Sequence, residues 1–310
     1  MRKKIVIGTR GSKLALWQAN HIADCLRNEY KDLEVILKYI TTTGDKILDV
    51  PLAKIGGKGL FTKELETEML EGTIDLAVHS LKDMPTALPE GLTLAAITKR
   101  VNPGDAIISP KYKTLANLPQ GANVGTSSLR RKAQLLSVRP DLIIRDLRGN
   151  VDTRLKKLET DNLDAIVLAA AGLKRLGWEE HITEILPKEV CLPAVGQGAL
   201  AIESRENDSE VLALLAFLND PATRYAVTAE RAFLKTVEGG CQVPVGVFGT
   251  LAGENLTVEA IIATIDGQTM IKDCVVGTCG EAASLGEQLA NRMLAAGGRK
   301  IMVDLGCMTE

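Results

Sequence analysis

Several residue types that many binding sites depend on are scarce in this chain of 310 residues. Aromatic residues make up only 3% of the sequence, which argues against a base-stacking surface for nucleic acid and against an aromatic-lined pocket. The three histidines lie far apart and no two cysteines form a Cys-x-x-Cys pair, so a zinc site has little to build on. We therefore expect no metal.

Long apolar runs and an excess of one charge are also missing. The apolar stretch at Ile5–Ile7 is too short for a signal-peptide core, and no run approaches the roughly 18 residues of a membrane-spanning helix. Lys and Arg total 37 against 39 Asp and Glu, so the chain as a whole is not biased towards nucleic acid. The six cysteines are scattered rather than arranged as a disulfide framework. These absences predict a cytoplasmic protein that contacts neither membrane nor nucleic acid.

The pattern of the first 170 residues predicts an α/β protein. Hydrophobic residues make up 45% of the chain, enough for a sizeable core, and short apolar runs alternate with amphipathic stretches, as in folds with largely parallel sheets. The expected strands are Lys4–Gly8, Val35–Thr41, Asp75–His79, Asp105–Ser109, Asn123–Gly125, Leu142–Asp146 and Ala165–Ala170, and the expected helices are Ser12–Asn28, Gly59–Glu71, Ser128–Val138 and Val151–Leu158.

Two segments rich in Pro and Gly divide the chain. Val101–Gly104 reads as a crossover between two α/β lobes, and Leu192–Gly198 reads as the return, because the strand-like Ala199–Glu203 is then placed to rejoin the first sheet. Two crossovers make a hinge beside a cleft. We expect domain 1 to comprise residues 1–100 and 199–218, and domain 2 residues 104–193.

The last part of the chain, residues 219–310, predicts a small α+β domain 3. Its expected elements are a helix at Pro221–Thr236, an antiparallel meander of three strands at Val245–Leu251, Leu256–Ala263 and Thr269–Val276, and a second helix at Glu281–Ala296.

Basic residues are concentrated between Thr126 and Lys157. This segment holds nine basic residues against three acidic ones, and six of the nine are Arg, which suits bidentate capture of carboxylate or phosphate. A solvated helix face would explain the charge equally well.

Three strand-to-helix turns nevertheless repeat one pattern of glycine, hydroxyl and arginine. Gly125–Ser128 precedes Arg130 and Arg131, Arg148–Asn150 precedes the next helix, and Gly8–Ser12 leaves the first strand. Backbone N–H groups at a helix start favour an anion. The repetition predicts a polyanionic ligand.

Three other loops carry candidate residues. Gly56–Gly59 lacks the spacing of a phosphate-binding P-loop and better suits a mobile glycine-rich lid carrying Lys54 and Lys58.

The second loop, Ser80–Pro85, places Lys82 and Asp83 directly after a strand. Lys82 could form a Schiff base, and Asp83 could act as an acid, a base or a cation stabiliser. Alternatively, the two residues form an ordinary salt bridge. The third, Gly239–Pro244, holds Cys241, which is either reactive or an inert small hydrophobe.

Taken together, these segments resemble the porphobilinogen deaminase (hydroxymethylbilane synthase) family. The resemblance rests on GTRGSKLALWQA, GGKGLFTKELE, DLAVHSLKDMPT, GTSSLRR, RGNVDTRL, LAAAGLKRLG, LPAVGQGALAIE and GGCQVPVG, which occur in order along nearly the whole chain and weaken only in the final sixty or so residues.

The resemblance implies a monomeric transferase of the haem pathway whose first two lobes look like those of periplasmic binding proteins. Such enzymes join four porphobilinogen units head to tail, releasing ammonia, to give the linear tetrapyrrole hydroxymethylbilane. They carry a dipyrromethane cofactor attached through a thioether to a cysteine that matches Cys241. The aspartate that stabilises the azafulvenium cation matches Asp83.

The resemblance also implies a set of binding residues for the pyrrole carboxylates. It assigns Ser80, Lys82, Thr126, Ser128, Arg130 and Arg131 to the cofactor, and Arg10, Ser12, Arg148 and Arg154 to the substrate or growing chain, with Gln18, Lys54, Lys58 and Arg175 in support. Two other classes stay open: a non-catalytic solute-binding protein for a small polyanion, and a nucleic-acid binder using the basic segment.

Overall fold

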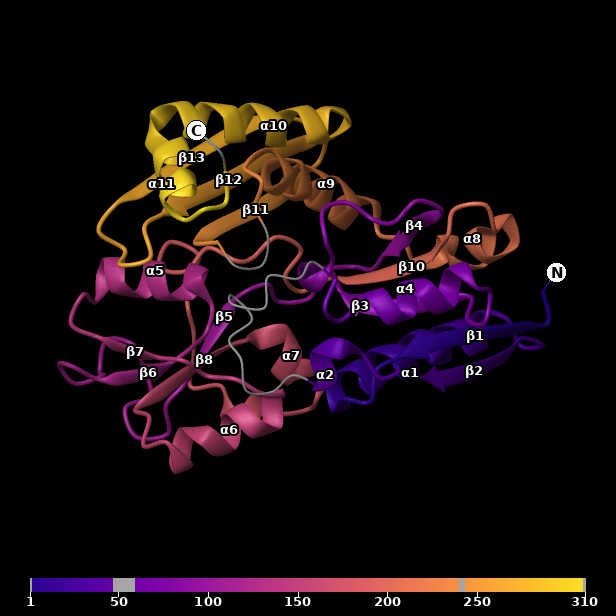
Figure 1. Ribbon diagram of the computed structural model, residues 1–310, viewed down its shortest axis with the longest axis horizontal. Helices are drawn as coiled ribbons and strands as arrows, with labels where there is room; N and C mark the ends of the chain where they lie inside the picture. The colour runs from indigo at the N-terminus through magenta and orange to yellow at the C-terminus, as the bar shows by residue number, and fades with distance from the viewer. Residues whose placement is uncertain (1, 47–58, 240–242, 309–310) are drawn as a thin grey trace.

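Three separate β-sheets organise the computed structural model, which describes residues 2–46, 59–239 and 243–308. Figure 1 shows lobe 1 on the right, lobe 2 at the lower left and the C-terminal domain above them. In the described part of the chain, no helix is both long and apolar enough to cross a membrane.

Lobe 1 is built on a mixed sheet with the order β2-β1-β3-β10-β4. β1 runs parallel to β2 and β3, whereas β10 is antiparallel to both of its neighbours. Apolar side chains such as Ile7, Ile22 and Ile202 are fully buried between this sheet and its helices. The elements are β1 (Lys4–Thr9), α1 (Lys13–Glu29), β2 (Glu34–Tyr39), α2 (Thr43–Lys46), α4 (Lys63–Leu70), β3 (Leu76–Ser80), the 3-10 helix η1 (Leu81–Asp83), β4 (Leu92–Ile97), β10 (Leu200–Arg205), α8 (Ser209–Leu215) and the 3-10 helix η3 (Ala216–Leu218).

Lobe 2 repeats the arrangement with the order β7-β6-β8-β5-β9. Its central strands are continuous apolar runs, because helices cover both faces of the sheet. The Ser128 side chain caps α5 by accepting a hydrogen bond from the Arg131 N–H. The elements are β5 (Asp105–Ile108), β6 (Asn123–Gly125), α5 (Leu129–Val138), β7 (Ile143–Arg145), α6 (Val151–Thr160), β8 (Ala165–Ala169), α7 (Ala170–Arg175), the 3-10 helix η2 (Glu179–His181) and β9 (Glu184–Ile185).

The C-terminal domain packs two helices on an antiparallel sheet of three strands. Phe233 on α9 is fully buried in its core. The two helices approach closely because Gly286 has no side chain; a Cβ there would lie 2.1 Å from the Ala229 carbonyl oxygen. The elements are α9 (Pro221–Thr236), β11 (Val245–Ala252), β12 (Asn255–Ala263), β13 (Met270–Thr278), the 3-10 helix η4 (Cys279–Glu281), α10 (Ala282–Met293), the π-helical turn η5 (Leu294–Gly298) and α11 (Arg299–Asp304).

The predicted fold class is confirmed: two α/β lobes precede a small domain with a three-stranded antiparallel sheet. In each lobe four of the five strands run in one direction, as expected, and a single inserted strand, β10 in lobe 1 and β5 in lobe 2, is antiparallel to both of its neighbours. The sequence interpretation missed β4 and the short helices α7 and α8.

The chain passes between the lobes twice. It leaves β4 for β5 through residues 98–104 and returns from β9 to β10 through residues 186–199. In the return segment, Gly196 and Gly198 both adopt left-handed backbone angles, with φ of 70° and 94°. Such angles suit glycine, and they flank Gln197, which lies buried between the lobes.

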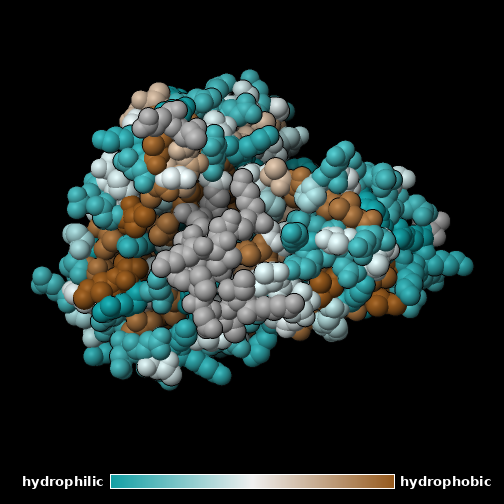
Figure 2. Space-filling view, in the orientation of Figure 1, coloured by the Kyte–Doolittle hydropathy of each residue, from teal (hydrophilic) through white to brown (hydrophobic). Residues whose placement is uncertain are grey.

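On the face shown in Figure 2, hydrophilic residues cover most of lobe 1, and hydrophobic ones gather over α5 in lobe 2. Val138, the last residue of α5, is one of the exposed large hydrophobic side chains.

Candidate active site

A cavity opens at the carboxyl ends of β1 and β3 in lobe 1. Because these strands are parallel neighbours, the turns that follow them meet at one edge of the sheet. The cavity has a volume of about 70 Å³. Its lining includes Arg10 and Ser12 from the first turn, Gln18 from α1, Phe61 and Thr62 before α4, and His79, Ser80 and Asp83 from the end of β3 and η1.

Arg10 is held in this cavity by two neighbours that the sequence did not suggest. Its Nε donates to both carboxylate oxygens of Asp45 at 3.1 Å, and its guanidinium lies 4.2 Å from the centre of the Phe61 ring. Burial alone would raise the pKa of Asp45, but hydrogen bonds from Arg10 and Thr42 outweigh it and hold that pKa below its ordinary value.

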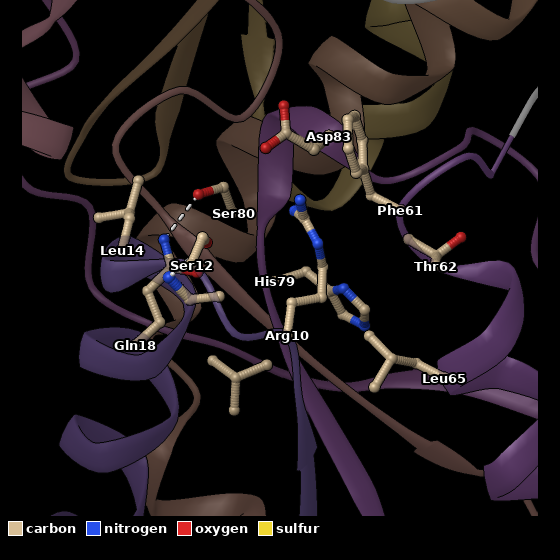
Figure 3. Close-up of a pocket in the computed structure, with 12 residues that line it drawn as sticks. Arg10, Ser12, Leu14, Gln18, Phe61, Thr62, Leu65, His79, Ser80 and Asp83 are labelled. Atoms are coloured by element: carbon tan, nitrogen blue, oxygen red, sulfur yellow. Dashed lines mark hydrogen bonds between the residues drawn. The ribbon is translucent and has the colours of Figure 1, made fainter. Parts of the chain in front are cut away.

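The polar residues opposite Arg10 hold one another in place. Gln18 Nε2 donates to Ser80 Oγ at 2.7 Å, the bond drawn as a dashed line in Figure 3. Ser12 Oγ accepts from the Ala15 N–H and so caps α1. Both hydroxyl residues therefore serve the local structure as well as facing the cavity.

Asp83 stands where cations from both lobes converge. Its carboxylate lines the lobe 1 cavity, and Figure 3 shows it beyond the guanidinium of Arg10. Burial lowers the pKa of Arg154 on α6 and of Arg175 on α7 to about 10, and the charge of Asp83 opposes that lowering at both. Both guanidinium groups thus remain charged at neutral pH, and one lobe 1 carboxylate acts on two lobe 2 arginines.

Lys82, next to Asp83, links the same loop to the return crossover. Burial lowers the pKa of Lys82 to about 8, with Asp83 opposing the effect. Its Nζ donates to Gln197 Oε1 at 3.4 Å, and Gln197 Nε2 donates to Asp105 Oδ1 at 2.9 Å. A chain of hydrogen bonds therefore runs from lobe 1 through the crossover into lobe 2.

Asp105 forms ion pairs with the two consecutive arginines of α5. Arg130 NH1 lies 2.7 Å from one carboxylate oxygen, and Arg131 Nε lies 2.9 Å from the other. Asp105 is 0% exposed; burial opposes its ionisation, yet the two guanidinium groups hold its pKa far below the ordinary value. The solvated-face alternative is wrong for Arg130 and Arg131, since both are buried.

A second cavity, of about 310 Å³, lies at the β6–α5 turn. It is lined by Thr126, Ser127, Ser128, Lys132 and Arg145, among others. The Thr126 hydroxyl accepts from the Ser128 N–H at 3.2 Å, a local bond that shapes the turn.

Arg154 and Arg175 are also tied to backbone. Arg154 Nε donates to the Gly149 carbonyl at 2.7 Å, and Arg175 NH2 donates to the Gly198 carbonyl at 2.8 Å. Arg148 stands just before Gly149, three residues before α6 begins at Val151.

Two family models match successive parts of the chain. The model described as "Porphobilinogen deaminase, dipyromethane cofactor binding domain" covers residues 5–213, and "Porphobilinogen deaminase, C-terminal domain" covers residues 224–295. The chain belongs to the porphobilinogen deaminase family.

Curated relatives are similar over almost their full length. Porphobilinogen deaminase of Geotalea daltonii is 54% identical over 303 residues, which is 98% of this chain and 95% of that protein. Porphobilinogen deaminase of Trichlorobacter lovleyi is also 54% identical, over 98% of this chain and 97% of that protein.

Solved structures of binding proteins show a weaker likeness. The methionine binding protein MetQ is 14% identical with a TM-score of 0.44, covering 70% of this chain and 89% of that one. The aliphatic sulphonate binding protein SsuA of Escherichia coli is 14% identical with a TM-score of 0.41, covering 76% of this chain and 71% of that one.

Three residues predicted for this porphobilinogen deaminase family member, Lys54, Lys58 and Cys241, lie outside the described residues. Among the cysteines that the structure describes, Cys191 is fully buried, and burial raises its pKa to about 12, so it stays a thiol. The same part of the chain contains no group of His, Cys, Asp and Glu that could hold a metal ion.

The sequence analysis missed Asp45, Phe61, Asp105 and Gln197 as parts of the site. Asp45 and Asp105 are single acidic residues whose arginine partners lie 35, 25 and 26 positions away. The one local sign of a site residue in the sequence was Gln197, which lies between two glycines.

Proposed function

We propose that this chain polymerises porphobilinogen head to tail, with loss of ammonia, to give hydroxymethylbilane for tetrapyrrole biosynthesis. The observation that carries the proposal is that Asp83, whose side chain lines the lobe 1 cavity, acts electrostatically on the three buried cations Lys82, Arg154 and Arg175. Family membership supports the same activity.

A cation-rich site suits this substrate. Every pyrrole unit carries an acetate and a propionate group, so negative charge accumulates as the chain grows, and buried arginines pair with carboxylates strongly. We assign substrate binding to Arg10, Ser12, Arg148 and Arg154, with Gln18, Lys54, Lys58 and Arg175 in support. Arg10 has Asp45 as a side-chain counter-ion, so its guanidinium is held in place before substrate arrives.

The residues assigned to the dipyrromethane cofactor fit its four carboxylates. They are Ser80, Lys82, Thr126, Ser128, Arg130 and Arg131, with Cys241 as the covalent anchor. Asp105 supplies one negative charge to the two guanidinium groups of Arg130 and Arg131, so these three residues keep a surplus of positive charge. When bound, the cofactor supplies the free pyrrole α-carbon to which the first unit is added.

Asp83 is assigned the central role in each addition. Cleavage of the C–N bond of porphobilinogen releases ammonia with the bonding electron pair and leaves an azafulvenium cation. A carboxylate aimed at the pyrrole N–H stabilises that cation electrostatically. The free α-carbon of the terminal pyrrole ring then attacks the methylene group and a C–C bond forms. The proton on that α-carbon leaves, which restores the aromatic pyrrole ring.

The intact mass of the denatured protein tests the anchor. We expect an excess equal to two deaminated porphobilinogen units, and we expect Cys241→Ser to lack it completely because a hydroxyl is far less nucleophilic than a thiolate. Cys279→Ser is the matched control and should keep the excess. Peptide mapping that places the adduct on a cysteine other than Cys241 contradicts the assignment. An intact mass that equals that of the unmodified polypeptide, both before and after addition of porphobilinogen, contradicts the activity.

The remaining proposals concern organisation. We propose the domain limits of residues 1–100 with 199–218, 104–193, and 219–310, supported by the pairing of β10 with β3 and β4. We also propose that the protein is a cytoplasmic monomer. Light scattering on a sizing column tests the oligomeric state.

A further inference from the structure

A buried group of two carboxyl side chains and one imidazole lies beneath the lobe 1 cavity. Glu66 comes from α4, His79 from β3 and Glu203 from β10, and they are 7%, 6% and 0% exposed. His79 stands opposite Ala201 in the antiparallel pair, so Glu203, two residues along, shares its face of the sheet. His79 Nε2 lies 3.0 Å from Glu203 Oε2.

The hydrogen bonds in this group are incomplete. Glu66 Oε1 and Glu203 Oε1 are both buried without a hydrogen-bond partner among the described residues. The apolar side chains nearby include Leu65 and Met69, on the same helix as Glu66. Burying an unpaired carboxylate costs much more free energy than burying a neutral carboxyl group, so the unpaired oxygen of Glu66 favours the neutral form of that side chain.

The surroundings of the two glutamates differ. Glu203 Oε2 lies within hydrogen-bond distance of His79 Nε2, and Glu203 also acts electrostatically on Arg231 of α9, whose guanidinium donates to the Pro85 carbonyl at 2.7 Å. Glu66 has Glu64 on its own helix and Glu203 opposite, both of which repel its charge, and only Thr62 and His79 favour it. Burial, followed by these effects, raises the pKa of Glu66.

We propose that Glu66 is a neutral carboxylic acid in the folded protein, and that Glu66 and Glu203 are positioning residues for His79 in the wall of the substrate cavity. Glu203 accepts from Nε2–H and so fixes the orientation of the ring that lines the cavity with Arg10, Ser80 and Asp83. The proton on Glu66 removes a second negative charge from beneath a site that receives polyanions.

Infrared spectroscopy tests the protonation state directly. In deuterated buffer at neutral pH, the difference spectrum between wild type and Glu66→Gln should contain the C=O band of one protonated carboxyl group, with no matching loss of a carboxylate band. Glu71→Gln, an exposed acid at the end of α4, is the matched control and should lose a carboxylate band instead. Loss of a carboxylate band in Glu66→Gln overturns the proposal.

The same spectroscopy covers the case in which Glu66→Gln does not fold. The wild-type protein alone should then show a buried carboxyl band at neutral pH that disappears reversibly on alkaline titration while the far-ultraviolet circular dichroism stays constant. Absence of any such band overturns the proposal.

Kinetics test the positioning role, and this part rests on the proposed function. Above its raised pKa, Glu66 ionises in wild type whereas the glutamine of Glu66→Gln stays neutral, so the ratio of wild-type to variant KM for porphobilinogen should grow with rising pH by roughly threefold, with kcat changed less. Lys82 and the substrate amine titrate in both proteins and cancel in the ratio. A constant ratio means that Glu66 is only structural. A chain that fails to turn over porphobilinogen contradicts the proposed function and leaves the infrared result standing.

Discussion

The two lobes hold their arginines in different ways. Arg10 in lobe 1 pairs with Asp45 at a cavity wall, and both side chains keep about a fifth or more of their surface exposed, at 20% and 24%. Arg130 and Arg131 in lobe 2 share Asp105, which has no exposed side-chain surface. One sequence pattern, a strand followed by hydroxyl and arginine, thus gives an accessible pair in one lobe and a buried cluster in the other. The position of the acidic partner decides which arrangement results.

Asp83 and Asp105 provide the largest contrast between the lobes, because one faces a cavity and the other is enclosed by donors. We expect Asp83→Asn, nearly isosteric but uncharged, to lower kcat by roughly 10³-fold, or about 4 kcal/mol, because a developing cation loses its carboxylate. The rate of ammonia release in a single turnover measures this loss. The urea midpoint of the variant should match that of wild type. A near-normal rate of ammonia release would contradict the role assigned to Asp83.

Asp105→Asn should act on stability instead. Removing the charge leaves two buried guanidinium groups without their counter-ion, and we expect the free energy of unfolding to fall by about 3–5 kcal/mol. Urea denaturation followed by circular dichroism measures the change. Asp141→Asn, which changes the partly solvated pair with Arg139, is the control in the same lobe and should leave the midpoint near wild type. If the two substitutions lowered the free energy of unfolding equally, burial of the ion pair would not explain the difference between them.

Lys82 connects the two regions and gives a pH dependence. Its pKa of about 8 lies below the ordinary value, so the ammonium is present below pH 8 and is lost above it. The rate at which apoprotein and porphobilinogen form the covalent adduct should therefore fall with rising pH, by up to about tenfold per pH unit above 8. Intact mass over time measures the rate. Lys82→Arg stays charged and should flatten the curve; an unchanged curve contradicts the role of Lys82.

The smallest effect is expected at the accessible pair of lobe 1. Asp45→Asn should cost about 1 kcal/mol or less, because both partners are partly solvated. The lowered pKa of Asp45 means that its contribution is present above the unfolded pKa of about 4 and disappears as pH falls through the folded pKa. Wild type and variant should thus converge in urea midpoint at acidic pH. A difference that widens as pH falls would contradict the sign.

The sequence predicted regular elements well and long-range partners poorly. Pro221–Thr236 matches α9, and Ala199–Glu203 was placed correctly as the strand that rejoins the first sheet, because both carry strong local signals. The strand β4 (Leu92–Ile97) was missed although its ends are buried, since its apolar pattern is short and adjoins a crossover.

Within the candidate site, residue types on turns were predictable but their partners were not. Lys82 and Asp83 follow a buried strand, which is visible in the sequence. That Gln197 connects Lys82 to Asp105 depends on two chain crossings between lobes, and nothing local specifies it. Burial of Arg130 and Arg131 likewise depends on Asp105 and on backbone carbonyls more than thirty positions away.

The place of β10 in the lobe 1 sheet has a consequence for biosynthesis. β10 separates β3 from β4 in the strand order, yet it leaves the ribosome only after all of residues 98–199 have been made. The strands of lobe 2 are contiguous in the chain, so all of them have been made before β10, and until then the edge of β3 has no partner on that side. The second lobe to be encoded is therefore the first to have all of its strands available.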